Sequence, residues 1–209
     1  MIQDFAFVPI QVLLATMILN SLLARREKVA MMKKVNMVVG VFFSEAGMRL
    51  LSQLAAFDQG RDELEGHLLI SHKWSDRDFA FLRSFLRGCD YKVDSRQGNL
   101  EELKIFLVRE RQFMLTLMEN PNLLEHQSFT DMLLAVFHLS EELSAREDLA
   151  GLPETDIDHI SGDIKRAYMR LLGEWVGYMK HLKEEYPFLF SFMIRTNPFD
   201  PQASVAITE

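Results

Sequence analysis

The sequence predicts an all-α protein in which one N-terminal transmembrane helix precedes a multi-helix cytoplasmic bundle. Apolar residues recur at helical spacing along the whole chain, and no segment alternates apolar and polar residues over the length of a strand. In addition, an apolar run near the N-terminus is followed at once by basic residues. The chain has 209 residues, so enough of it remains after this run to form one domain with its own core.

The apolar run, residues 5–24, contains no charged residue in twenty positions. A helix of that length spans about 30 Å, the thickness of the hydrocarbon core of a bilayer. Lys and Arg gather on the cytoplasmic side of membrane helices, where they also contact anionic headgroups. The chain therefore predicts a single pass through an inner or plasma membrane, with residues 1–4 outside and the domain in the cytoplasm. The headgroup contacts would come from five bases that follow the run: Arg25, Arg26, Lys28, Lys33 and Lys34.

Two other interpretations of this run stay open. A cleaved signal peptide carries positive charge before its apolar run, whereas here Asp4 precedes the run and the bases follow it. A buried core helix of a soluble protein would give hydrogen-bond partners to the polar side chains in the run, which lipid does not supply. Those side chains belong to Gln11, Thr16, Asn20 and Ser21.

One face of the predicted membrane helix carries Pro9, Thr16 and Asn20, at spacings of seven and four residues. Small, hydroxyl and amide side chains hold helices together in lipid, so this face is a candidate interface with another membrane helix. The alternative is that Asn20 simply reaches the polar surface of the membrane.

The remaining chain divides into helices at recognisable start and stop signals. Residues 25–57 form a basic juxtamembrane segment and a long helix from residue 29, whose part from residue 35 packs with a bundle over residues 58–196. Ser75, Asn99, Ser128 and Thr155 are the predicted helix caps. A short aromatic helix follows Pro187, and Pro198 and Pro201 predict a flexible tail over residues 197–209.

The charge and the cysteine content of the chain exclude several classes of partner and site. The chain has 23 basic and 30 acidic residues, and five of the bases lie in the cluster after the apolar run. The bundle is therefore strongly acidic, which argues against a nucleic-acid partner, since that needs a basic face. The single cysteine, Cys89, excludes an intrachain disulfide and a zinc site built from cysteines.

No catalytic residue and no cofactor are predicted, because the chain lacks a Walker loop, a Rossmann glycine pattern, a nucleophile elbow and a Cys–His arrangement. A weak metal candidate is formed by Asp156, His159 and Asp163, which share one face at the start of a long helix. The alternative is that acids near a helix N-terminus favour its dipole. His138 lies opposite the apolar face of its own helix, so a solvated position is expected.

A ligand candidate lies further along the same long helix, where Glu174, Tyr178 and His181 occur beside the apolar stripe. These side chains could form a polar pocket among the helices. The alternative is that they are boundary residues, since Glu174 and His181 project away from the centre of the stripe.

Residues 120–139 and 186–200 resemble a group of uncharacterised bacterial single-pass membrane proteins. The resemblance implies one anchor followed by a helical cytoplasmic domain, and it supplies no site. Two functions follow as expectations. The first is a membrane-anchored interaction, scaffold or regulatory protein without catalytic activity, whose partners are the lipid bilayer and a second copy or another membrane protein. The second is a membrane-tethered sensor that binds a metal or small ligand in the bundle.

Overall fold

The computed structural model describes residues 2–206, and the side chains of residues 2–10, 124 and 125 lie outside this description. The predicted all-α class is confirmed: the described chain contains helices and one isolated bridge between Asp58 and Val93, but no strand. The elements in order are α1 (Ile2–Phe42), a π-helical turn η1 (Phe43–Gly47), α2 (Met48–Ala55), α3 (Arg61–Leu68), α4 (Asp76–Gly88), α5 (Leu100–Met118), a 3₁₀ turn η2 (Pro121–Glu125), α6 (Gln127–Ser144), α7 (Glu154–Glu185) and α8 (Pro187–Arg195).

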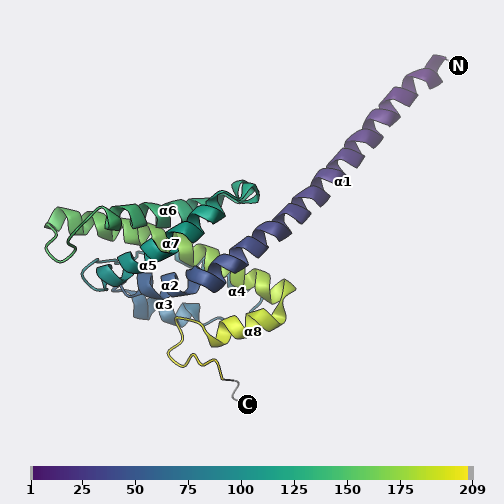
Figure 1. Ribbon diagram of the computed structural model, residues 1–209. Helices are drawn as coiled ribbons and strands as arrows, with labels where there is room; N and C mark the ends of the chain where they lie inside the picture. Colours follow the sequence, from purple (N-terminus) through teal and green to yellow (C-terminus); the bar gives the residue numbers. More distant parts are fainter. Residues whose placement is uncertain (1, 207–209) are drawn as a thin grey trace.

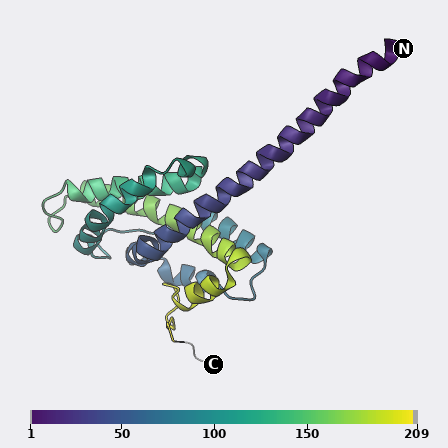
Figure 2. The same ribbon diagram turned by 45° about the vertical axis from the view of Figure 1, so that its right-hand side comes forward.

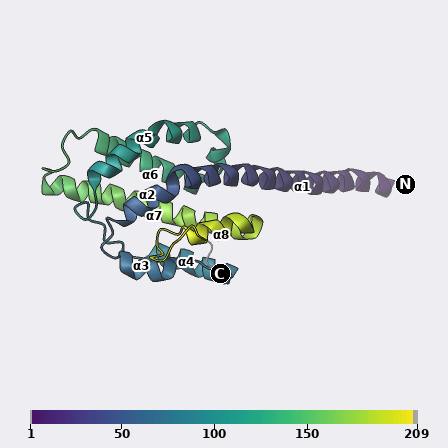
Figure 3. The same cartoon turned by 60° about the horizontal axis from the view of Figure 1, so that its bottom comes forward.

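Helix α1 has two parts that differ in their surroundings. Its N-terminal part extends away from the bundle in every view (Figures 1, 2 and 3), and the side chains of residues 11–30 are all exposed. Its C-terminal part enters the bundle, where Val35, Val39 and Phe42 are buried. By length and composition, the continuous helical segment Gln11–Ala55 is long and apolar enough to cross a membrane, a criterion that core helices and signal sequences also meet.

The π-helical turn η1 joins α1 to α2, and the chain changes direction there (Figure 3). Phe42 packs edge-on against Phe129 of α6, with ring centroids 5.4 Å apart. Phe43 stacks on Tyr178 of α7 at 5.0 Å. Because two consecutive aromatic residues at the junction of α1 and η1 contact two different helices, the C-terminal end of α1 is fixed in the core of the bundle.

Helix α7 forms the centre of the bundle and contacts α1, α2, α4, α6 and α8. Its apolar residues recur at helical spacing, so that Ile164, Leu171 and Trp175 are fully buried. Helix α6 runs beside α7 as the other arm of a helical hairpin (Figure 1), and these two helices position the polar cluster described below.

Two of the four predicted helix caps are confirmed. Ser75 and Asp78 form a capping box, and the Asn99 side chain accepts a hydrogen bond from the Glu102 backbone N–H at 3.0 Å. The predicted cap at Ser128 is wrong: α6 begins one residue earlier, and His126 Nδ1 faces the Phe129 N–H at 3.3 Å. The predicted cap at Thr155 is also wrong, because Pro153 already has the geometry that lets α7 begin at Glu154.

The predicted flexible tail needs correction at its start. Phe199 is fully buried and its ring centroid lies 5.5 Å from that of Trp175. The Asn197 side chain is also buried and donates a hydrogen bond to the Leu68 carbonyl at 2.9 Å. These contacts extend the packed domain past α8, whereas residues 201–206 are exposed and residues 207–209 lie outside the described chain.

Candidate functional site

A pocket of about 710 Å³ lies where α1 meets α4 and α7. It brings together the three ligand candidates of the sequence, Glu174, Tyr178 and His181, and adds Asn36 from α1. Its volume lies within the range of about 300–1,000 Å³ that small-molecule sites occupy. The full lining is Met32, Asn36, Val39, Arg83, Leu86, Arg87, His126, Ser128, Met169, Arg170, Gly173, Glu174, Gly177, Tyr178, Lys180, His181 and Glu184.

The His181 imidazole is held on the α1 side of this pocket. Its Nδ1 lies 3.2 Å from the Asn36 side-chain nitrogen, and an amide N–H can donate only to a ring nitrogen that carries no proton. Burial lowers the pKa of His181, against the opposing influence of Glu185 and Glu184. Both observations favour a neutral imidazole that bridges α7 to α1.

Basic side chains from α4 and α7 surround the rest of the pocket. Arg170 pairs with Asp131 at 3.1 Å, and Lys180 pairs with Asp76 at 3.0 Å. Arg83 and Arg87 make no ion pair with any described side chain. The pocket therefore combines apolar side chains with two guanidinium groups that could pair with a small anion, and Glu174 and Glu184 add acidic groups to the same lining.

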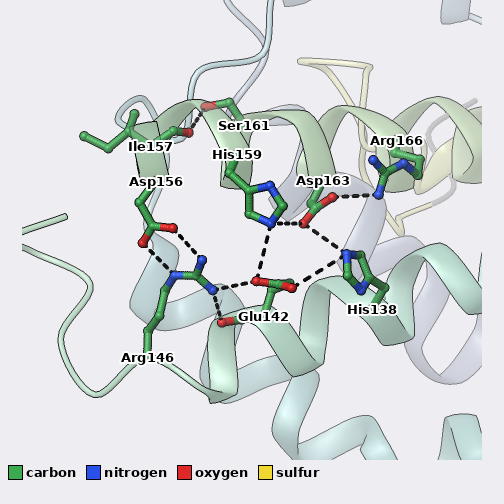
Figure 4. A network of polar contacts seen from close by, with 9 residues as sticks. All are labelled: His138, Glu142, Arg146, Asp156, Ile157, His159, Ser161, Asp163 and Arg166. Atoms are coloured by element: carbon green, nitrogen blue, oxygen red, sulfur yellow. Dashed lines mark hydrogen bonds and ion pairs between the residues drawn. The ribbon is translucent and has the colours of Figure 1, made fainter. Parts of the chain in front are cut away.

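A second polar group lies elsewhere on the bundle, between α6 and α7 (Figure 4). Here His138 and Glu142 of α6 meet His159 and Asp163 of α7, and one nitrogen or oxygen from each residue lies within 4.8 Å of the others. Each pair has i,i+4 spacing and so occupies one face of its helix. The helical hairpin brings the two faces together.

Asp163 is the most deeply buried member of this group. Its side chain is 2 % exposed, whereas those of His138 and His159 are 46 % and 50 % exposed. Asp163 Oδ1 accepts a hydrogen bond from Arg166 at 2.6 Å, but no described residue donates a hydrogen bond to Asp163 Oδ2. That oxygen faces His138 Nε2 at 3.3 Å and His159 Nε2 at 3.4 Å.

Arg146 binds two carboxylates at the edge of this group. It donates two hydrogen bonds to Asp156, at 2.6 and 2.8 Å, and one to Glu142 Oε2 at 2.8 Å. The Arg146 guanidinium lowers the pKa of both carboxyl groups, and these carboxylates in turn raise the pKa of Arg146. Glu142 and Asp156 are therefore ionised at neutral pH.

The group of possible metal ligands in the structure therefore differs from the group predicted from the sequence. His159 and Asp163 lie together, but Asp156 is paired with Arg146, and the other two members come from α6. His138 lies at the surface, as a solvated residue would, yet its Nε2 faces the buried carboxylate. The prediction from the sequence missed this grouping. The sequence does contain two copies of a His-x-x-x-acid spacing, one on each of two consecutive helices, and this spacing could have indicated it.

The membrane-related candidates all lie on α1. Thr16 and Asn20 are exposed, the side chain of Pro9 lies outside the described residues, and the Thr16 hydroxyl donates to the Val12 carbonyl at 2.7 Å. The hydroxyl of Ser21 likewise donates to the Ile18 carbonyl at 2.8 Å. Arg25, Arg26, Lys28, Lys33 and Lys34 are exposed on the following turns.

The sequence of the helical bundle matches a known protein family. Residues 31–195 match a family model described as "Uncharacterized protein MJ1433, C-terminal helical domain", and the chain is a member of that family. The chain is 45 % identical over 200 residues to a protein from Methanocaldococcus jannaschii that carries the description "Uncharacterized protein MJ1433". The match covers 96 % of this chain and 80 % of that protein. No solved structure matches.

The family match begins close to the point where α1 becomes buried. It starts at residue 31, four residues before Val35, which is the first buried residue of α1 after residue 10. The pocket and the polar cluster both lie within the matched range. The matched region therefore corresponds to the bundle with the part of α1 that packs against it.

Proposed function

We propose that the protein is a membrane-anchored helical domain that holds its acidic bundle at the cytoplasmic face, where it binds a partner or regulates one. The observation that carries this proposal is the exposed N-terminal part of α1. Each of its large apolar side chains leaves about half or more of its surface uncovered. These side chains belong to Val12, Leu13, Leu14, Met17, Ile18, Leu19, Leu22 and Leu23.

The positions of these side chains favour a bilayer as their surroundings. They include runs of three consecutive residues, so they point to all sides of the helix and not to one stripe. Burying one such side chain is worth about 1.5–3 kcal/mol, so leaving eight in water would be strongly unfavourable. Thr16 and Ser21 satisfy their hydroxyl groups within the helix, which removes part of the cost of placing them in lipid.

The anchor is tested by extracting membranes that contain the full chain with alkaline carbonate. The wild-type protein should stay in the membrane, and Leu14→Arg combined with Ile18→Arg should release it, because a charge in the middle of a span is unfavourable. The matched control is Val205→Arg combined with Ala206→Arg, which places the same two charges on the exposed tail. A wild-type chain that washes off as a monomer would contradict the proposal.

The orientation is tested with an impermeant thiol reagent in a Cys89→Ala background. With the basic cluster inside, a cysteine at Ser204 should react only after the membrane is opened, and a cysteine at Gln3 should react on intact cells. The opposite labelling pattern would place the bundle outside and would reverse this part of the proposal.

Self-association through the anchor is the partner interaction that the sequence suggests most directly. We expect Thr16→Leu combined with Asn20→Leu to reduce chemical crosslinking of the full chain in detergent, whereas Leu19→Ala should not. Equal crosslinking of all three proteins would leave the bundle, and not this face of α1, as the surface for partners.

A second candidate function, a small-ligand sensor, is favoured by the pocket between α1, α4 and α7. We expect inorganic phosphate or adenosine monophosphate to raise the melting temperature of the full chain through Arg83 and Arg87. Gly173→Leu should abolish this shift by filling the pocket, since no atom lies within 4 Å of a Cβ at that position. His181→Ala should weaken it. Melting temperatures that do not respond to either probe would remove anionic ligands of this kind from consideration.

A further inference from the structure

We infer that His138, Glu142, His159 and Asp163 form a binding site for one divalent transition-metal ion between α6 and α7. The inference concerns a site remote from the pocket and does not depend on the membrane anchor. It rests on three observations: the spacing of the four side chains, an oxygen of Asp163 that lacks a hydrogen bond, and the groups that hold the carboxylates in place (Figure 4).

The spacing of the ligand atoms fits a tetrahedral site. Metal–ligand bonds of about 2.0–2.1 Å, as for Zn²⁺ with nitrogen and oxygen, place tetrahedral ligand atoms about 3.3–3.4 Å apart. Asp163 Oδ2 lies 3.3 Å from His138 Nε2 and 3.4 Å from His159 Nε2. His159 Nε2 also lies 3.5 Å from Glu142 Oε2, and His138 Nε2 lies 3.8 Å from Glu142 Oε1. Small side-chain rotations would bring one atom from each of the four residues to bonding distance of one ion.

Asp163 Oδ2 is the atom that most needs such an ion. An aspartate that is 2 % exposed must have its charge compensated, and Arg166 reaches only its other oxygen. No described residue donates a hydrogen bond to Oδ2, and both nearby imidazole nitrogens point at it. Two ring nitrogens that converge on one buried carboxylate oxygen offer three ligand atoms to a single cation.

The surrounding charges hold the ligands without repelling a cation. Arg166 fixes Asp163, and Arg146 fixes Glu142 while its own charge is balanced by Asp156. Ligating carboxylates are typically hydrogen-bonded in this way by groups that do not touch the metal. With neutral imidazoles, which metal binding requires, three carboxylates outweigh two guanidinium groups, so a dication is attracted.

The donor set selects the class of metal. Two imidazole nitrogens and two carboxylates suit Zn²⁺, Fe²⁺, Co²⁺ or Mn²⁺, whereas Ca²⁺ and Mg²⁺ prefer oxygen ligands alone. Because each helix contributes one histidine and one acid, a bound ion would join the arms of the α6–α7 hairpin. The half-exposed imidazoles also leave the site open to solvent, so the metal could exchange.

The test uses the full chain, purified in detergent through a tag without histidine, stripped with a chelator and titrated with Zn²⁺ and Co²⁺. We expect one ion per chain, the visible absorption of tetrahedral Co²⁺, and a rise in melting temperature with Zn²⁺. His138→Ala and His159→Ala should each raise the Kd for Zn²⁺ more than about tenfold, because the loss of outer partners alone typically has effects of 10- to 100-fold.

The control is Asp158→Ala, which removes an exposed acid next to His159 that makes no ion pair with a described side chain. It should bind Zn²⁺ as the wild type does. Both histidines are half exposed, so their alanine variants should remain folded, which circular dichroism would verify. The inference is overturned if the wild-type chain binds no Zn²⁺ or Co²⁺, or if it binds them as tightly after both histidines are replaced.

Discussion

At the scale of single residues, the glycines differ in whether the surrounding atoms leave room for a Cβ atom. A Cβ at Gly98 would lie 2.6–2.7 Å from three atoms of the Phe57 ring, and that ring is 1 % exposed. A Cβ at Gly162, in the interior of α7, would meet no atom within 4 Å. Close approach requires glycine at the first position, whereas nothing in the packing requires it at the second.

We therefore expect Gly98→Ala and Gly162→Ala to have opposite effects. Gly98→Ala should lower the free energy of unfolding by about 1–3 kcal/mol, because the buried ring must move. Gly162→Ala should raise it by about 0.5–1 kcal/mol, since alanine favours the helix. Denaturant unfolding of both variants measures the difference. A destabilising Gly162→Ala would show that this face of α7 is covered by something else.

His181 gives the stability of the fold a dependence on pH. Because its pKa is lowered in the folded protein, the unfolded chain binds more protons just below pH 6.5, and stability falls as the pH drops through this window. We expect the melting temperature to decrease between pH 7.5 and 5.5 by less in His181→Gln than in the wild type. Parallel pH profiles for the two proteins would show that His181 does not contribute.

At the scale of elements, the sequence predicts that helices exist better than it predicts where they begin. Repeated apolar spacing identifies α5, α6 and α7 because each buries one stripe. Local caps identify starts only where no neighbouring turn competes. Asn99 caps α5, but the 3₁₀ turn η2 leads into α6 at Gln127, two residues before the start that a cap at Ser128 would give. Burial of Phe199 depends on Trp175 of α7, a contact between segments that no local pattern contains.

Contacts between distant segments also explain why the sequence predicts only part of the polar cluster. Asp156, His159 and Asp163 were predicted together because one helix face carries them. Their true neighbours, His138 and Glu142, come from α6 and meet them only when the hairpin has packed. A helical wheel gives the direction of a side chain on its own helix, and the identity of the facing helix comes from tertiary structure.

Two of the four predicted caps, Asn99 and Ser128, allow a direct comparison of sequence pattern and structure. Asn99→Ala should lower the free energy of unfolding by about 1 kcal/mol, because the Glu102 N–H loses its partner at the start of α5. Ser128→Ala should change it by less than about 0.5 kcal/mol, since Ser128 lies inside the first turn of α6. Equal losses for the two variants in denaturant unfolding would show that Ser128 stabilises α6 in a way its contacts do not indicate.

At the scale of the whole molecule, α1 connects two environments. The side chains of residues 11–30 are all exposed, whereas Val35, Val39 and Phe42 belong to the core of the bundle. The helix therefore transmits its position directly to the bundle, because no loop lies between the exposed and the buried part. Asn36 of α1 faces His181 of α7 in the lining of the pocket, so α1 is part of the wall of that pocket.

The division within α1 predicts how the chain can be shortened. A fragment of residues 31–209 removes the exposed apolar part and keeps each buried residue that the structure describes in α1, so it should be soluble and monomeric and should melt cooperatively. A fragment of residues 44–209 also loses Val35, Val39, Phe42 and Phe43, which leaves a gap against Phe129 and Tyr178. We expect that fragment to aggregate or to melt without a cooperative transition. Sizing and calorimetry distinguish the two, and aggregation of the longer fragment would mean that residues 2–30 belong to the core of the protein and not to a membrane.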